Sequence, residues 1–138
     1  YFSKHRKVKE YMDNQIASCK EKGYSETILG RKRPIHEISA VAYMVRQLGE
    51  RLAMNSPIQG SAADIIKVAM IKVYNSLKKN FPDTKIILQV HDELILCAPK
   101  RDSKQVKELL RRDMEEAVKL SVKLVADVNE GYTWYDLK

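Results

Sequence analysis

The stretch Gln89–Leu94, "QVHDEL", lies inside an otherwise apolar run, "IILQVHDELILCAP". An apolar run of this length is typical of strands that are buried in a core. Because burying one unpaired carboxylate costs on the order of several kcal/mol, the two acids require a base, a hydrogen-bond network, a metal ion or a solvated turn. We therefore predict two strands, Lys85–Val90 and Leu94–Ala98, with "HDE" at the tip of a tight hairpin.

The first half of the chain is predicted to be mainly helical. Apolar residues recur at helical spacing between residues 8 and 19, and Gly23 is placed to end that helix. The segment "GYSETILGRKRPI" is typical of a short hairpin that turns near Gly30. Residues 41–52 indicate a second helix. A third is expected to begin with Ser56 as its cap and Pro57 at its first position.

In the second half of the chain, a helix and one more strand are predicted after the hairpin. Apolar positions indicate a helix over residues 103–120, and "SVKLVADV" (121–128) alternates as a half-buried strand does. The fold class is thus α+β, with an antiparallel sheet (the hairpin plus a third strand) packed on helices. Three strands are few for a sheet that contains so apolar a hairpin. We therefore expect neighbouring strands outside this chain, or self-association through the exposed edge.

Composition narrows the class of protein. The chain has 138 residues, a formal net charge of +7 and a pI near 9.4, which favours a polyanionic partner. It opens on Tyr1, so we expect it to be part of a longer protein. Cys19 and Cys97 form no metal-type pair, which predicts reduced thiols. No apolar stretch approaches the roughly 18 residues of a membrane span, and we expect a cytoplasmic protein.

Asp92 and Glu93 are the candidate catalytic acids. At a hairpin tip both could approach one cation, although a merely solvated turn is as common. The apolar arms favour the functional reading, because they would hold the tip rigidly against a core. Mg²⁺ usually needs two carboxylates plus phosphate, so Asp92 by itself predicts half of a metal site. His91 is ambiguous from its position alone.

A second polar group precedes the third predicted helix, in "RLAMNSPIQG". Arg51, Asn55 and Gln59 are spaced by four residues. A helix-capping role explains the presence of Ser56, and capping is one alternative role for Asn55. Gln59 adjoins Gly60, and glycine permits close approach of a large partner. Asparagine and glutamine amides can donate to the minor-groove acceptors that every correct base pair presents.

These blocks together resemble a known family. "ERLAMNSPIQGSAADIIKVAMI" followed by "LQVHDELILCAP" is similar to the carboxy-terminal end of bacterial family A DNA polymerases, and the resemblance extends through the closing "GYTWYDLK". It implies a carboxy-terminal portion of a DNA-directed DNA polymerase, with an incomplete palm and a helical remnant of the fingers. Residues 1–48 would be the tail end of the fingers and residues 49–138 the second half of the palm.

The resemblance also implies roles for single residues. Asp92 corresponds to the second catalytic aspartate, a ligand of the two Mg²⁺ ions, and Glu93 to the supporting acid beside it. His91 corresponds to a histidine near the primer terminus. Arg51, Asn55 and Gln59 correspond to contacts with primer–template DNA. The complete enzyme would use deoxynucleoside triphosphates and would be associated with the bacterial nucleoid.

The chain also departs from the family pattern. It has no "DYSQIE"-type run, which carries the other catalytic aspartate, and no triphosphate-binding fingers helix. We therefore expect the 138 residues alone to be inactive. In "GRKRPIHEI", Lys32 and His36 stand in the usual arginine and proline places. The resemblance assigns no role to these two residues or to Cys97.

Two other functions remain open. A non-catalytic, basic nucleic-acid-binding module would account for the net charge but not for the "HDE" tip. An independent metal-dependent hydrolase would need further acids near Asp92, and Asp64 and Asp83 are the nearest in the sequence.

Overall fold

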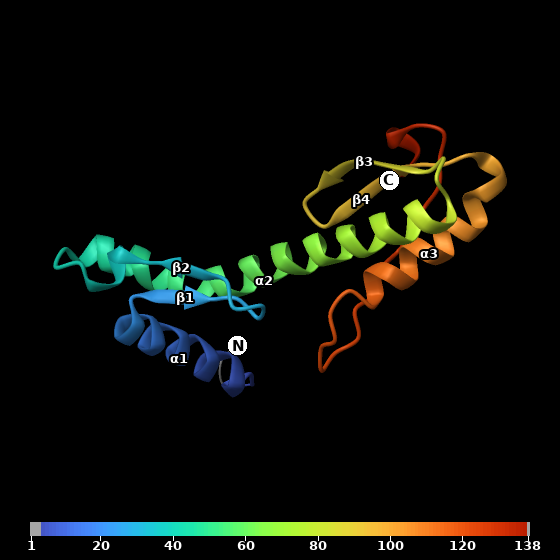
Figure 1. Cartoon of the computed structure of the whole chain (residues 1–138). Coiled ribbons are helices and arrows are strands. Elements are labelled where there is room, and N and C mark those ends of the chain that lie inside the picture. The colour runs from blue at the N-terminus through green and yellow to red at the C-terminus, as the bar shows by residue number, and fades with distance from the viewer. Residues whose placement is uncertain (1–3, 138) are drawn as a thin grey trace. The chain divides into compact units, whose positions relative to one another are not determined.

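The computed structural model describes residues 4–137, which form two compact units divided between Asp64 and Ile65 (Figure 1). Two small antiparallel sheets pack on helices, which confirms the predicted α+β class. Within the described range, no helix is both long and apolar enough to cross a bilayer.

The first unit contains helix α1 (Arg6–Lys22), strands β1 (Tyr24–Glu26) and β2 (Lys32–Pro34), and the 3-10 helix η1 (His36–Ser39). Helix α1 ends where predicted, at Gly23, whose φ of 79° lies in the left-handed region that favours glycine. The predicted hairpin is also present, with Tyr24 paired to Pro34.

The core of the first unit joins α1, η1 and the beginning of helix α2 (Tyr43–Asn80). Cys19, Ile35, Ile38 and Ala53 are buried together. Burial raises the pKa of the Cys19 thiol, and the thiols of Cys19 and Cys97 are both free. Gly49 is required at this contact, since a Cβ there would lie 2.5 Å from the backbone nitrogen of Ile38.

Helix α2 corrects the sequence prediction of two separate helices. It continues unbroken for 38 residues, with Pro57 in its interior, so neither Asn55 nor Ser56 is a cap. An internal proline removes a helical hydrogen bond and costs about 3 kcal/mol. Tertiary contacts offset this cost, because Ser56 and Pro57 are buried and Arg33 Nη1 donates to Ser56 Oγ at 3.0 Å.

The β1–β2 hairpin is attached to α2 in part through Asp64. Thr27 Oγ1 donates to Asp64 Oδ2 at 2.5 Å, and Arg31 Nη2 lies 2.8 Å from Asp64 Oδ1. The amide of Ile28 donates to Ser61 Oγ at 3.0 Å. The buried carboxylate therefore has both a hydrogen bond and an opposite charge, as burial requires.

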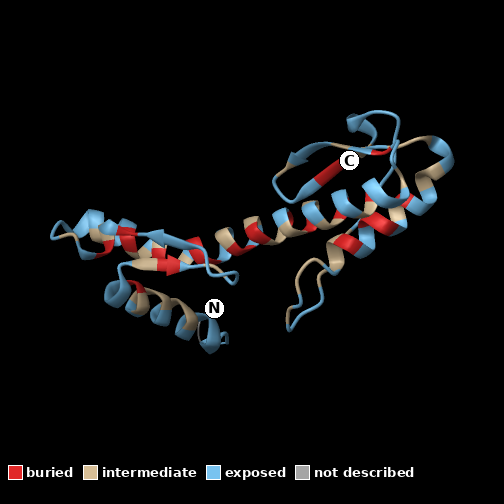
Figure 2. Cartoon of the chain, viewed as in Figure 1, coloured by how far each residue is buried: buried red, intermediate tan, exposed pale blue. Residues whose placement is uncertain are grey.

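The second unit contains the remainder of α2, strands β3 (Lys85–Val90) and β4 (Glu93–Cys97), the 3-10 helices η2 (Lys100–Asp102) and η3 (Trp134–Leu137), and helix α3 (Ser103–Glu115). In Figure 2 the buried residues of α3 lie on the side that faces α2. The core is formed by Ile66, Val73, Leu77, Leu94, Val106, Leu109 and Leu110. Leu94 brings β4 into this core, which fixes one face of the β3–β4 hairpin.

Two predictions for the second unit were wrong. Helix α3 ends at Glu115 rather than at residue 120, where Glu115 Oε1 accepts from the amide of Ala126 at 3.1 Å. Residues 121–128 form no strand in the described part of the chain. The predicted alternation of buried and exposed side chains is still present, since Leu124, Ala126 and Val128 are half-buried between exposed neighbours. An extended segment becomes a strand only when another strand pairs with its backbone.

The buried residue Leu77 should contribute strongly to stability. Leu77 is 3% exposed, so replacing it with alanine leaves a cavity and should lower the free energy of unfolding by about 2–5 kcal/mol. Chemical denaturation followed by circular dichroism measures this loss. The matched control is Ile71→Ala on the same helix, where the side chain is 59% exposed and the change should be within about 0.5 kcal/mol. Equal effects would contradict the described core.

The attachment of the hairpin by Asp64 is also testable. Asp64→Asn removes the charge that pairs with Arg31 and should cost about 1 kcal/mol, a modest value because the guanidinium is half-exposed. Hydrogen exchange should then accelerate at the amide of Ile28. Glu50→Gln is the control, because it breaks the more exposed pair with Lys20 in the same unit. Unchanged exchange at Ile28 would show that Asp64 does not hold the hairpin.

Candidate functional site

The tip of the β3–β4 hairpin is a two-residue turn formed by His91 and Asp92. Antiparallel pairing runs from Lys85 opposite Cys97 to Val90 opposite Glu93, with an irregularity between Ile86 and Leu88. Glu93 was predicted to lie in the tip, but it is the first residue of β4. The tip is therefore tighter than the sequence indicated.

His91 has an unusual backbone conformation. Its φ is 51°, in the left-handed region that non-glycine residues adopt at a cost of about 1 kcal/mol or more. The side chain of Gln89 compensates locally, since its Nε2 donates to the carbonyl of His91 at 2.6 Å. Sequence reasoning gave Gln89 no role. No periodic signal marks this contact, because the partner of Gln89 is the backbone carbonyl of a turn residue.

The acids at this hairpin are open to an external ligand. His91, Asp92 and Glu93 are all exposed. Within residues 4–137, the carboxylates of Asp92 and Glu93 accept no hydrogen bond and form no ion pair. Leu94, the next residue, is buried in the core of the second unit. A fixed strand thus presents unneutralised carboxylate oxygens at its end, and such oxygens suit hard cations.

The second predicted group lies on α2 in the first unit. Because α2 is continuous, Arg51, Asn55 and Gln59 follow one another at i, i+4 and i+8 and lie on one side of the helix. All three are exposed. The predicted break at Pro57 would have separated them, so the uninterrupted helix produces a polar stripe that the sequence did not lead us to expect.

Gly60 and the basic run "GRKR" have partners inside the chain. A Cβ at Gly60 would lie 2.6 Å from Thr27 Cγ2, so the close approach that glycine permits is used by the β1–β2 hairpin. Arg31 Nη2 donates to the Gly60 carbonyl at 3.0 Å. Lys32 Nζ lies 4.7 Å from the centre of the Tyr24 ring. The run therefore helps to fasten the hairpin.

The acids that a hydrolase would have needed are used elsewhere. Asp64 is bound by Thr27 and Arg31, and Asp83 Oδ2 pairs with Arg101 Nη2 at 2.7 Å. Across the described residues, no three His, Cys, Asp or Glu side chains are grouped closely enough to hold a metal ion. The arrangement offers Asp92 and Glu93 as contributors to a site, without the further ligands that a complete site requires.

Comparison with known proteins identifies the family. Residues 1–136 match DNA polymerase family A. DNA polymerase I of Caldicellulosiruptor bescii is 52% identical over all 138 residues, and those of Bacillus caldotenax and Streptococcus pneumoniae are 48% and 46% identical. The chain spans 16% of the length of each of these relatives.

A solved structure also matches. It is the POL domain of Pol1 from M. smegmatis in complex with a DNA primer-template and dNTP, with 39% identity and a TM-score of 0.96. The match covers 99% of this chain and 24% of that one. With the family match over nearly the whole sequence, these findings show that the chain belongs to DNA polymerase family A.

Proposed function

We propose that this chain supplies one catalytic carboxylate and part of the DNA contact surface of a DNA-directed DNA polymerase. The observation that carries the proposal is the exposed, unpaired Asp92 at the end of a hairpin anchored in a core, in a chain of this family. The reaction would be template-directed nucleotidyl transfer to a primer 3′-hydroxyl. Residues 1–48 would belong to the fingers and residues 49–138 to the palm.

The donor atoms at the tip fit Mg²⁺ in part. Asp92 would be the direct ligand, with Glu93 in support, since carboxylate oxygens are hard donors. Mg²⁺ commonly takes more than one carboxylate together with substrate phosphates, so further ligands would come from residues outside this chain and from the triphosphate. When bound, the metal stabilises negative charge on the transferring phosphoryl group.

The chain's own residues would orient and hold the reactants. The hydrogen bond from Gln89 fixes the turn, so Asp92 would be presented without a large entropy loss on binding. His91 would lie near the primer terminus. Arg51, Asn55 and Gln59 would donate to the minor groove of the primer–template, where acceptors are present in every correct pair. Such donors would favour extension of properly paired ends.

The isolated chain would also associate with itself. Each strand of the β3–β4 sheet is paired on only one side within the described residues, and Ile87 and Leu88 are exposed. Unpaired strand edges and exposed apolar residues favour association. In a complete polymerase, other strands would cover this surface.

A non-catalytic nucleic-acid-binding module is the alternative function. The net charge of +7 supports it. The exposed carboxylates at the tip do not, because they would repel the phosphate backbone unless a cation lay between them. Binding that depends on salt but not on Mg²⁺ or Asp92 would favour this alternative.

The 138-residue chain alone should not extend a primer. With Mg²⁺, a primed template and dNTPs, we expect no primer extension above background, because one carboxylate cannot complete the metal site. Extension of a labelled primer resolved by gel electrophoresis measures this. Activity that survives rigorous removal of host polymerase would overturn the prediction.

In the full-length parent, Asp92→Ala should reduce primer extension by about 10²–10³-fold or more, since charge stabilisation at the transferring phosphate would be lost. Single-turnover extension measures the loss. The matched control is Asp127→Ala, which removes an exposed aspartate outside the tip and should leave the rate unchanged within about twofold. Full activity of Asp92→Ala would refute the proposed role.

A further inference from the structure

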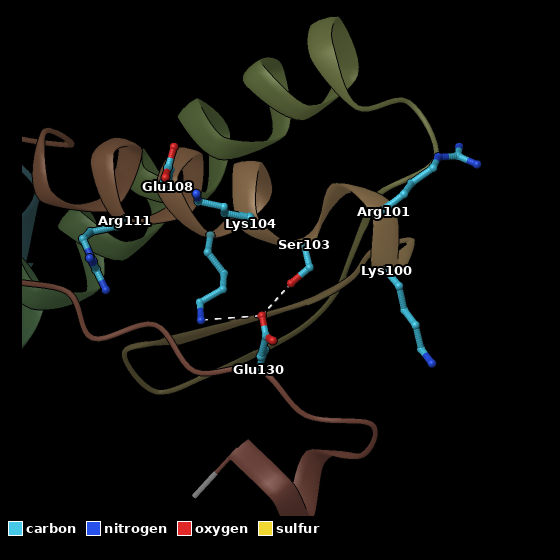
Figure 3. A pocket seen from close by; sticks show the side chains of 8 residues that line it. Lys100, Arg101, Ser103, Lys104, Glu108, Arg111 and Glu130 are labelled. Carbon is cyan, nitrogen blue, oxygen red and sulfur yellow. Dashed lines mark hydrogen bonds and ion pairs between the residues drawn. The ribbon is translucent and has the colours of Figure 1, made fainter.

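A cationic groove lies along α3, away from the residues assigned to catalysis. This "α3 groove" has a volume of about 530 Å³, and basic lining residues outnumber acidic ones five to two. Its lining includes Lys100, Ser103, Lys104, Lys107, Arg111 and Glu130 (Figure 3).

The helical repeat explains why these cations share one side. Lys104, Lys107 and Arg111 are spaced by three and four residues, which places them on one face of α3. The opposite face carries Val106, Leu109 and Leu110 in the core. Lys104 and Arg111 form no ion pair with any residue in the described range, so their charges are available to an external anion.

The groove already holds one oxyanion from the chain itself. Glu130 Oε2 accepts a hydrogen bond from Ser103 Oγ at 2.5 Å and lies 3.5 Å from Lys107 Nζ (Figure 3). The Ser103 hydroxyl, followed by the Lys107 charge, lowers the pKa of the Glu130 carboxyl. The groove therefore stabilises an exposed carboxylate, whose charged oxygens resemble those of a phosphodiester.

An aromatic surface adjoins the cations. Lys100 Nζ lies 4.6 Å from the centre of the Tyr132 ring, and Tyr132 is 85% exposed. A basic groove next to an exposed aromatic ring is the combination with which proteins bind single-stranded nucleic acid: cations contact the backbone and bases stack on the ring. An acidic protein segment would use the charges but would leave the ring without a stacking partner.

We propose that the α3 groove is a second nucleic-acid surface, which binds the phosphates of a single strand while a base stacks on Tyr132. This surface goes beyond the proposed polymerase function, because nucleotidyl transfer at Asp92 does not require it. Glu130 then competes with the strand phosphate for Ser103 and Lys107, so it limits affinity.

The first test measures binding of a fluorescent dT oligonucleotide of about 12 nucleotides to the 138-residue chain by anisotropy. Lys104→Gln/Arg111→Gln should weaken binding about tenfold at low salt and reduce the slope of log K against log salt by about 1.4, the value for two lost phosphate contacts on a single strand. The control, Lys119→Gln/Lys123→Gln, makes the same charge change in the same unit outside the groove and should alter affinity less than twofold. Equal losses in both variants would overturn the proposal.

The second test separates stacking and competition from simple charge. Tyr132→Ala should weaken binding at least fivefold, because a stacking base is lost. Glu130→Gln should tighten it severalfold, whereas Asp127→Asn, with the same charge change outside the groove, should have less effect. The proposal would be overturned if neither variant behaved as expected. It would also be overturned if a poly-glutamate peptide, or a duplex of the same length, bound as tightly as the single strand and lost affinity equally in these variants.

The two proposals can fail separately. The groove is tested by strand affinity, and the proposed catalytic role of Asp92 by primer extension. Circular dichroism of each variant verifies that α3 remains folded, and glutamine is well tolerated in helices.

Discussion

The interior proline of α2 is the constraint on which the first unit depends. A proline at this position removes a backbone hydrogen bond, and a free peptide of this sequence would break or bend there. The chain keeps the helix because hairpin β1–β2 covers this part of it. Arg33 contacts Ser56, while Thr27 and Arg31 hold Asp64 one turn beyond the glycine at position 60. The helix and the hairpin therefore stabilise each other.

This mutual support has a functional consequence. The stripe formed by Arg51, Asn55 and Gln59 exists only if α2 continues through Pro57. If the helix broke there, Gln59 would turn away from the other two side chains. A hairpin without any proposed contact to DNA thus sets the geometry of residues for which such contacts are proposed. The resemblance assigned no role to Lys32 of this hairpin, and the contacts of the hairpin with α2 indicate a positioning one.

The β3–β4 hairpin solves a different problem, which is how to hold charged residues next to a core. Leu94 is buried, whereas Asp92, two residues earlier, is exposed. The change occurs between Glu93 and Leu94, because successive residues of a strand face opposite sides. The left-handed His91, whose carbonyl is held by Gln89, forms the turn that carries Asp92. Both acids are therefore exposed and remain available to a cation.

Local sequence patterns determined much of the secondary structure of this protein. Helical spacing with Gly23 predicted α1, the turn signal near Gly30 predicted the β1–β2 hairpin, and the apolar arms around "HDE" predicted the β3–β4 hairpin and the exposure of Asp92. These features depend on contacts between near neighbours in the chain. Only the tertiary structure decided that α2 continues through its proline and that residues 121–128 form no strand. Both outcomes depend on a distant partner that is present or absent: Arg33 contacts Ser56, and no strand lies beside residues 121–128 within the described chain. A sequence pattern states what a segment can form, and long-range contacts decide whether it does.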